Sequence, residues 1–162
     1  PLYSQHLDVD DESWRDKACG VVALKTLLDY WEVNGNTEVG ELINRGLALD
    51  GYIEKIGWKH KELVLIGNQY GLVGDNFDWH TDEPAIAFEK LETHLKKYPI
   101  LCSIDKDLKP GNSGHLVVVY KYDRSRVLYL DSDAKERIDI ERSASLEEFL
   151  AGWKRRIITV YK

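Results

Sequence analysis

Residues 115–131 read HLVVVYKYDRSRVLYLD, and this stretch does most to decide the fold. Its runs at 116–120 and 127–130 have the length and the β-branched and aromatic content typical of buried strands. The polar residues between the two runs indicate a turn. We therefore expect two neighbouring strands, with His115 entering the first strand and Asp131 following the second.

The pattern on either side of this stretch separates helices from strands along the chain. Residues 1–17 are extended and acidic in character, and apolar residues then recur at helical spacing through much of the first half. We expect helices at 18–31, 37–49, 60–70 and 84–98, further strands at 100–104, 137–140 and 156–160, and a short helix from Ser145 to about Trp153. Helices that precede strands favour an α+β fold over βαβ alternation.

Composition indicates an ordinary globular protein. The 162 residues are 43% hydrophobic and 31% charged, which suits one domain spanning residues 1–162. The net charge of −6 argues against a nucleic-acid partner, because phosphate binding needs a concentrated basic face. The only basic cluster, Lys154 to Arg156, is too short to change that interpretation.

Cysteine and methionine usage bear on where the protein works. Two cysteines, Cys19 and Cys102, make no disulfide framework, and a reducing compartment is the simplest interpretation. No apolar run is long enough to span a membrane. Because the chain contains no methionine, we expect that an initiator methionine, a leader or a partner domain has been removed. The expected location is cytoplasmic, or secreted or membrane-associated if a leader or neighbouring domain is missing.

Cys19 is the first candidate for chemistry, because it lies in the first turn of the helix expected at 18–31. Unpaired backbone N–H groups and the helix dipole favour a thiolate at that position. Gly20 would leave room for a substrate backbone to approach. The alternative is a buried structural cysteine beneath a helix, which is equally common.

His115 and Asp131 complete a possible catalytic group. A histidine where a glycine-rich loop enters a strand can take a thiol proton and later return it to a leaving group. A carboxylate after the neighbouring strand can hold the other ring nitrogen, and Asp133 competes with Asp131 for this role. Taken singly, His115 is explained equally well as a surface residue and Asp131 as a turn residue.

Together these residues resemble the double-glycine leader peptidases of the papain clan, which occur in bacterial bacteriocin exporters, and especially their stand-alone relatives. The resemblance rests on Cys19-Gly20-Val21-Val22-Ala23-Leu24, on Ser113-Gly114-His115-Leu116-Val117-Val118-Val119, on Leu130-Asp131 and on Tyr3-Ser4-Gln5. It implies a papain-like fold, in which an N-terminal helical part packs on a C-terminal antiparallel sheet.

The same resemblance implies roles for four residues. Cys19 would be the nucleophile, His115 the base and Asp131 the residue that orients the histidine, while Gln5 would donate to the oxyanion hole. The substrate would be a peptide or protein cut after small residues such as glycine, and no cofactor is implied. Val21 and Ser132 stand where the family often has proline, and the segment between Gln5 and Cys19 is long.

Some other functional classes are compatible with the same residues, and others are not. A related thiol acyl-transfer enzyme, such as an amidase, deamidase or transferase, would need the same three groups, and a peptide-binding module would have the fold without activity. The strand ending in Asp131 also resembles a phosphatase nucleophile, but too few residues follow it for the remainder of that site. The isolated histidines provide no zinc-binding motif: His6, His60, His80 and His94.

Overall fold

The computed structural model describes residues 2–162, which form five α-helices, eight strands and three short 3-10 segments. The helices are α1 (Cys19–Tyr30), α2 (Val39–Ala48), α3 (His60–Gln69), α4 (Pro84–Leu95) and α5 (Leu146–Gly152). The strands are β1 (Tyr52–Ile53), β2 (Gly57–Trp58), β3 (Val73–Asp78), β4 (Ile100–Asp105), β5 (Gly114–Asp123), β6 (Arg126–Leu130), β7 (Glu141–Ser145) and β8 (Trp153–Tyr161). The 3-10 segments are η1 (Glu12–Lys17), η2 (Lys106–Leu108) and η3 (Arg137–Asp139).

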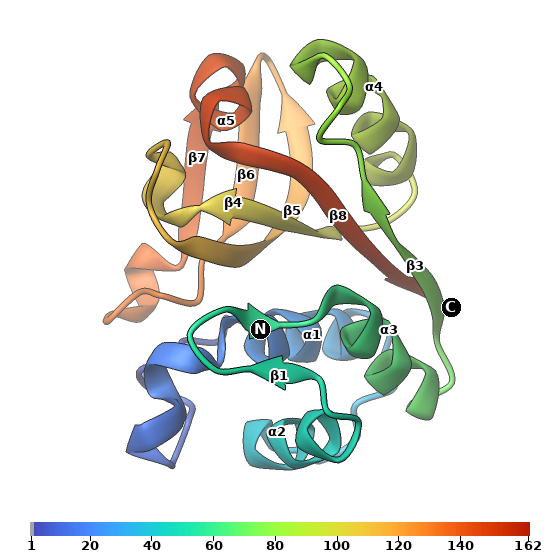
Figure 1. Ribbon diagram of the computed structural model, residues 1–162, viewed down its shortest axis with the longest axis vertical. Coiled ribbons are helices and arrows are strands. Elements are labelled where there is room, and N and C mark those ends of the chain that lie inside the picture. Colours follow the sequence, from blue (N-terminus) through green and yellow to red (C-terminus); the bar gives the residue numbers. More distant parts are fainter. Residues whose placement is uncertain (1) are drawn as a thin grey trace.

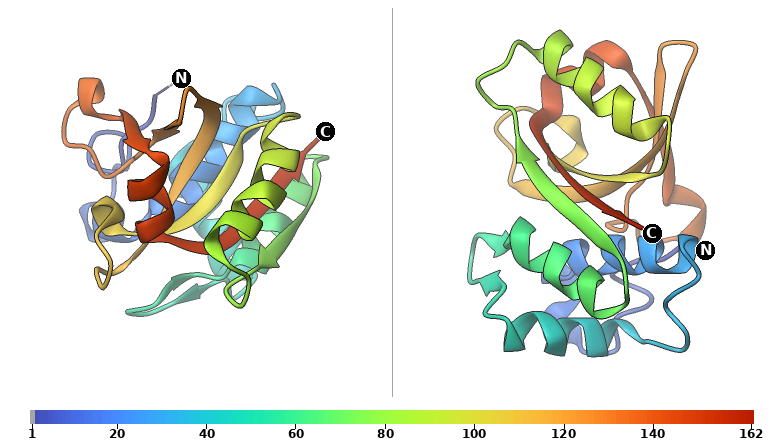
Figure 2. Two further views of the ribbon diagram at one scale, coloured as in Figure 1. Left: turned by 90° about the horizontal axis from the view of Figure 1, so that it is seen from above. Right: turned by 90° about the vertical axis from the view of Figure 1, so that its right-hand side faces the viewer.

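A six-stranded antiparallel sheet separates two groups of helices. Helices α1, α2 and α3 lie on one side of it, while α4 and α5 cover the other (Figures 1 and 2). Alternate residues of each central strand face the two sides, so that Leu101 joins the core with α1 and Cys102 joins the core with α4. The protein is therefore α+β with a papain-like arrangement, as the sequence predicts.

The strand order is β3-β8-β4-β5-β6-β7, and every neighbouring pair is antiparallel. Strand β8 is the last element that the structure describes, yet it lies between β3 and β4 in the sheet and runs diagonally toward the C-terminus in Figure 1. Because of this placement, Ile158 and Val160 of β8 pack in the same core as α1, which lies near the other end of the sequence.

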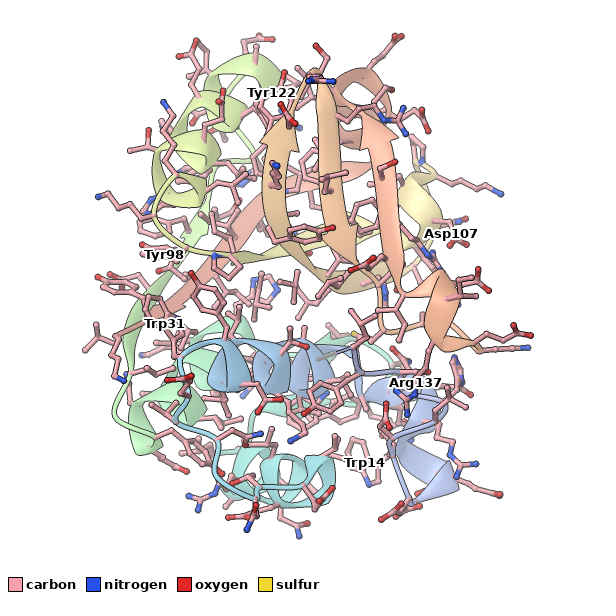
Figure 3. All side chains as sticks on the ribbon, turned by 180° about the vertical axis from the view of Figure 1, so that it is seen from behind. Trp14, Trp31, Tyr98, Asp107, Tyr122 and Arg137 are labelled. Atoms are coloured by element: carbon pink, nitrogen blue, oxygen red, sulfur yellow. The ribbon has the colours of Figure 1, made fainter. Side chains whose placement is uncertain are left out.

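Contacts at the edges of the molecule also join the layer of α1, α2 and α3 to the rest of the fold. The indole of Trp31 at the end of α1 lies 6.3 Å from the ring of Tyr98 and donates to the Val160 carbonyl at 3.0 Å (Figure 3). At the opposite rim Arg137 pairs with Asp8 at 2.7 Å. Within residues 2–162, no helix combines the length and the apolar character that crossing a bilayer requires.

The sequence-based expectations are wrong at both edges of the sheet. Residues 137–140 were expected to form a strand, but they contain η3, and the edge strand is β7 at 141–145. The opposite edge strand, β3, was not expected at all. Strand β3 is mostly exposed and only one residue of β7 is buried, so both edge strands lack the apolar pattern that identifies a buried strand.

The contact between β3 and β8 predicts a large effect of a small substitution. A Cβ added to Gly74 would lie 1.9 Å from the backbone oxygen of Thr159 in β8, so Gly74→Ala must push the two strands apart. We expect the free energy of unfolding to fall by about 3 kcal/mol, as measured by urea denaturation.

Gly40→Ala in α2 is the matched control, because a Cβ there meets no atom within 4 Å. It should raise the free energy of unfolding by about 0.5 kcal/mol through helix propensity. Equal effects at the two glycines would contradict the proposed strand contact.

Candidate active site

Helix α1 presents Cys19 at its first position. The N-cap residue, Ala18, makes no side-chain capping bond, so no side chain competes there for the N–H groups of the first turn. Cys19 itself is half-buried, whereas the other cysteine, Cys102, is fully buried in β4. The two cysteines therefore differ in access, and Cys19 lines a cavity.

Strand β5 brings His115 to Cys19. His115 pairs with Ile104 of β4 in the sheet and is only 7% exposed. Burial opposes ionisation of the thiol, but its hydrogen bond to His115, the charge of that ring and the backbone N–H groups of Leu116 and Gly20 hold the pKa of Cys19 below its ordinary value. Burial likewise opposes the charged imidazole, yet Asp131 and Cys19 together raise the pKa of His115 to about 10. These directions favour a thiolate–imidazolium pair.

Asp131 holds the far side of the imidazole. His115 donates through Nε2 to Asp131 Oδ1 at 2.6 Å, which leaves Nδ1 as the ring nitrogen available to the thiol. Asp131 is almost completely buried, and it also accepts from the backbone N–H of Asp133 at 2.9 Å. Burial raises its pKa, but the partners His115 and Arg142 outweigh that effect and the pKa of Asp131 is lowered.

Asp133 makes different contacts. Its carboxylate lies 2.6 Å from His6 Nε2 and 2.8 Å from Lys106 Nζ. The structure thus brings Cys19, His115 and Asp131 together and directs the competing carboxylate elsewhere.

Arg142 of β7 is a contact of Asp131 that the sequence pattern did not reveal. Its Nη1 lies 2.9 Å from Asp131 Oδ2, on the oxygen that His115 does not use. The same nitrogen lies 3.3 Å from Asp107. The residue lies on an edge strand with no apolar alternation, so its neighbours were hidden without knowledge of the register.

For the hydrolytic activity proposed below, Arg142→Met is expected to lower kcat/KM about tenfold, because Asp131 loses a charge that helps to keep it ionised and oriented. Arg142→Lys should restore most of the loss. Arg126→Met is the control, since Arg126 is exposed and donates to Ser143 instead. A pH–rate profile identical to that of the unmodified protein would contradict this positioning role.

Gln5 contacts Ser132, the residue after Asp131, and is not among the described residues that line the cavity beside Cys19. It is buried, its Nε2 donates to the Arg15 carbonyl at 2.7 Å, and its Oε1 accepts from Ser132 Oγ at 2.9 Å. Its backbone N–H also donates to the Ser132 carbonyl at 2.9 Å. A proline at 132 would lack the hydroxyl that bonds Gln5. The oxyanion role of Gln5 remains a prediction.

A cavity of about 180 Å³ opens beside the Cys19–His115 pair. Among the described residues, its lining includes no Asp or Glu, and it includes Trp58, His60, Lys154 and Arg156. A larger cavity of about 490 Å³ lies toward the other end of α1, near Thr26 and Tyr30, and the described residues that line it include no cysteine or histidine. Size alone therefore does not identify the reactive site.

Trp58 occupies the space that two glycines leave open. A Cβ on Gly20 would lie 3.0 Å from Trp58, and one on Gly46 would lie 2.3 Å from its ring. The expectation that Gly20 makes room for a substrate backbone is therefore wrong, because the indole fills that room. Trp58 also donates to the Lys17 carbonyl at 2.7 Å, which fixes it as one wall of the cavity.

The residues described in the structure provide no cluster for a metal ion. No group of three or more His, Cys, Asp or Glu side chains within 2–162 is arranged to hold one.

A helix-borne cysteine next to a sheet-borne histidine, in this α+β architecture, places the fold among the papain-like cysteine peptidases. The chain belongs to the Peptidase C39-like family, whose sequence profile matches residues 1–157. No curated protein sequence matches it.

Solved structures share the fold at low sequence identity. A putative C39-like peptidase from Bacillus anthracis has a TM-score of 0.69 and 15% identity over 100% of this chain and 94% of that one. The peptidase domain of Streptococcus ComA, a bifunctional ABC transporter involved in quorum sensing, has a TM-score of 0.66 and 17% identity over 90% and 92%. A double-glycine-motif protease from an AMS/PCAT transporter, solved with its leader peptide, has a TM-score of 0.65 and 15% identity over 99% and 90%.

Proposed function

We propose that residues 1–162 form one peptidase domain that hydrolyses peptide bonds, with Cys19 as nucleophile, His115 as acid and base, and Asp131 as the orienting residue. The observation that carries this proposal is that Cys19 and His115 line one cavity while His115 donates to the buried carboxylate of Asp131 at 2.6 Å. Membership of the Peptidase C39-like family supports it.

The geometry suits acyl transfer in two steps. The Cys19 thiolate attacks the substrate carbonyl carbon, and the negative charge that develops on the oxygen is stabilised by the backbone N–H of Cys19, with Gln5 as the second donor suggested by the resemblance. The His115 imidazolium gives its proton to the departing amine, and the C–N bond breaks. Water then attacks the thioester while His115 takes its proton, and the acid product leaves with Cys19 restored.

A peptide is the substrate class best supported. One structural neighbour is described as a protease in complex with a leader peptide. The resemblance to double-glycine peptidases suggests a small residue such as glycine before the cut, and the wall formed by Trp58 beside Cys19 is consistent with a narrow approach.

The reactivity of Cys19 against pH provides the test. A lowered pKa at Cys19 means that a larger share of this thiol is ionised at mildly acidic pH than of an ordinary thiol, whose pKa is about 8.5. We expect iodoacetamide to alkylate Cys19 rapidly at pH 6, as read by peptide mass spectrometry. His115→Ala should slow this reaction by a factor on the order of ten or more, because the charge that stabilises the thiolate is removed.

Peptide hydrolysis should differ from alkylation at high pH. His115 must be protonated to release the amine, so hydrolysis should decline as pH rises through about 10, while alkylation by the thiolate should not. Cys102 is the internal control, because burial raises its pKa and blocks access in the folded protein. An ordinary thiol curve at Cys19 would contradict the proposed function.

A further inference from the structure

The cavity beside Cys19 concentrates positive charge in an acidic protein. The chain has a net charge of −6, yet the described lining of this cavity contains Lys154 and Arg156 and no carboxylate. Such a sign reversal at a cleft attracts anionic groups and holds them in place.

Lys154 reaches the immediate neighbourhood of the reacting groups. A Cβ built on Gly114 would lie only 3.2 Å from Lys154 Nζ, and Gly114 directly precedes His115. The ammonium group has a loose partner, Asp105, at 3.9 Å, and the side chain is partly exposed. It therefore retains hydrogen-bond donors for a group that enters the cavity.

Arg156 lines the cavity and is held by an ion pair with a residue outside it. Its Nε lies 3.1 Å from Asp78 Oδ2, and Asp78 does not line the cavity. Because a guanidinium carries five N–H groups, this contact leaves others free to donate. Arg156 pairs in the sheet with Ser103, another lining residue.

An irregularity in β8 presents the two cations together. The pairing between β4 and β8 moves from Arg156 to Trp153 across adjacent residues of β4, so that residues 154–155 are extra. Arg155 adopts a φ of 59°, in the left-handed region, and donates to the Asp82 carbonyl at 2.7 Å. Bulges of this kind re-aim side chains beside active sites. Here Arg155 bonds to Asp82, while its neighbours Lys154 and Arg156 both line the cavity.

His60, at the first position of α3, responds to the same two cations. Burial, then Arg156 and Lys154, lower the pKa of this histidine, although Asp78 opposes them. His60 is therefore neutral near pH 7 and adds a hydrogen-bonding group to the wall without adding a charge.

We infer that this cavity binds an acidic side chain of the peptide substrate, within two residues of the scissile bond, and that Lys154 and Arg156 determine this specificity. The inference rests on the proposed function for its substrate class. A carboxylate entering the cavity accepts charge-assisted hydrogen bonds from the ammonium and the guanidinium, which an uncharged amide cannot match.

Two measurements on the full chain test this inference. The first compares kcat/KM for end-blocked fluorogenic peptides that carry Glu, Gln or Lys at each of the two positions on either side of the cut. The second measures binding of the same peptides to the Cys19→Ala protein by fluorescence anisotropy. At one position Glu should exceed Gln by about tenfold in both measurements, and Lys should be the poorest.

Substitutions then assign the preference to the two cations. Lys154→Gln and Arg156→Gln should each reduce the Glu-to-Gln ratio, and the double variant should bring it close to one. Both side chains are partly exposed, so folding should be preserved. Lys135→Gln is the control, because Lys135 is exposed and lies outside the cavity lining.

The outcomes separate the two proposals. Cleavage with equal rates for Glu and Gln at every position would overturn the inference and leave the peptidase in place. Absence of cleavage, combined with tighter binding of the Glu peptide that depends on Lys154, would support the anion site and overturn the proposed function. Equal binding and no cleavage would overturn both.

Discussion

Cys19→Ala is expected to lower kcat/KM for peptide hydrolysis by a factor on the order of 10⁵, the largest effect of any single substitution in this protein. The alanine keeps the backbone N–H at the start of α1 but removes the atom that forms the acyl-enzyme. Cys102 cannot replace it, because that thiol is fully buried in β4 and burial raises its pKa. The measurement is the rate of cleavage of a glycine-glycine peptide, with circular dichroism to verify the fold.

Cys102→Ala is the matched control for this prediction. It removes the other thiol of the chain at a position that faces α4 and is outside the cavity. Activity should remain within about threefold, although the free energy of unfolding falls by about 1 kcal/mol through the lost packing. Residual activity above one per cent in Cys19→Ala would rule out this cysteine as nucleophile.

Asp131→Ala carries the second largest expected effect, a fall in kcat/KM on the order of 10³-fold. The imidazole loses the acceptor at 2.6 Å that holds its Nε2, so the ring is no longer held toward Cys19. Asp131 also raises the pKa of His115, so its removal should move the alkaline decline of hydrolysis from about pH 10 to lower pH. The pH–rate profile therefore distinguishes this role from a purely structural one.

The stability of Asp131→Ala should fall as well. Arg142 and the backbone N–H of Asp133 both lose an acceptor, and we expect the free energy of unfolding to drop by about 3 kcal/mol in urea. Asp133→Ala is the control, since its carboxylate contacts His6 and Lys106 rather than His115. Equal losses of activity in the two variants would contradict the assignment of Asp131.

Much of the fold could be predicted from the sequence, because the central strands and the helices are apolar where they are buried. Leu116 and Val118 of the Val-rich run pack in the same core as the helix beginning at Cys19, and both elements were predicted. The edge strands β3 and β7 were missed because they bury little. Their assignment depends on backbone pairing with a neighbour, which leaves no periodic trace in the residues themselves.

The candidate site was predictable only in part. Cys19, His115 and Asp131 each begin or follow an identifiable element, so the topology could be expected to bring them together. The contact of Arg142 with Asp131 depends on the register of an edge strand, and the position of Trp58 depends on the glycines beneath its indole. A single sequence shows neither the register nor that packing.

The basic run at 154–156 shows the same limit. The sequence predicts that this run is too short to bind nucleic acid, and it gives no sign of the bulge that sends Arg155 one way and its neighbours another, because the bulge is a property of sheet pairing. The sequence shows that these three residues are charged, but it does not show which way each side chain points.

The position of β8 between β3 and β4 has a consequence for biosynthesis. Strands β3 and β4 each pair with β8 and not with each other, so β3 cannot join the rest of the sheet until residues 153–161 have left the ribosome. The helix that carries Cys19 emerges far earlier. During translation the thiol is therefore present while one wall of its cleft is still missing, and the nascent chain gains its complete cleft only once β8 has emerged.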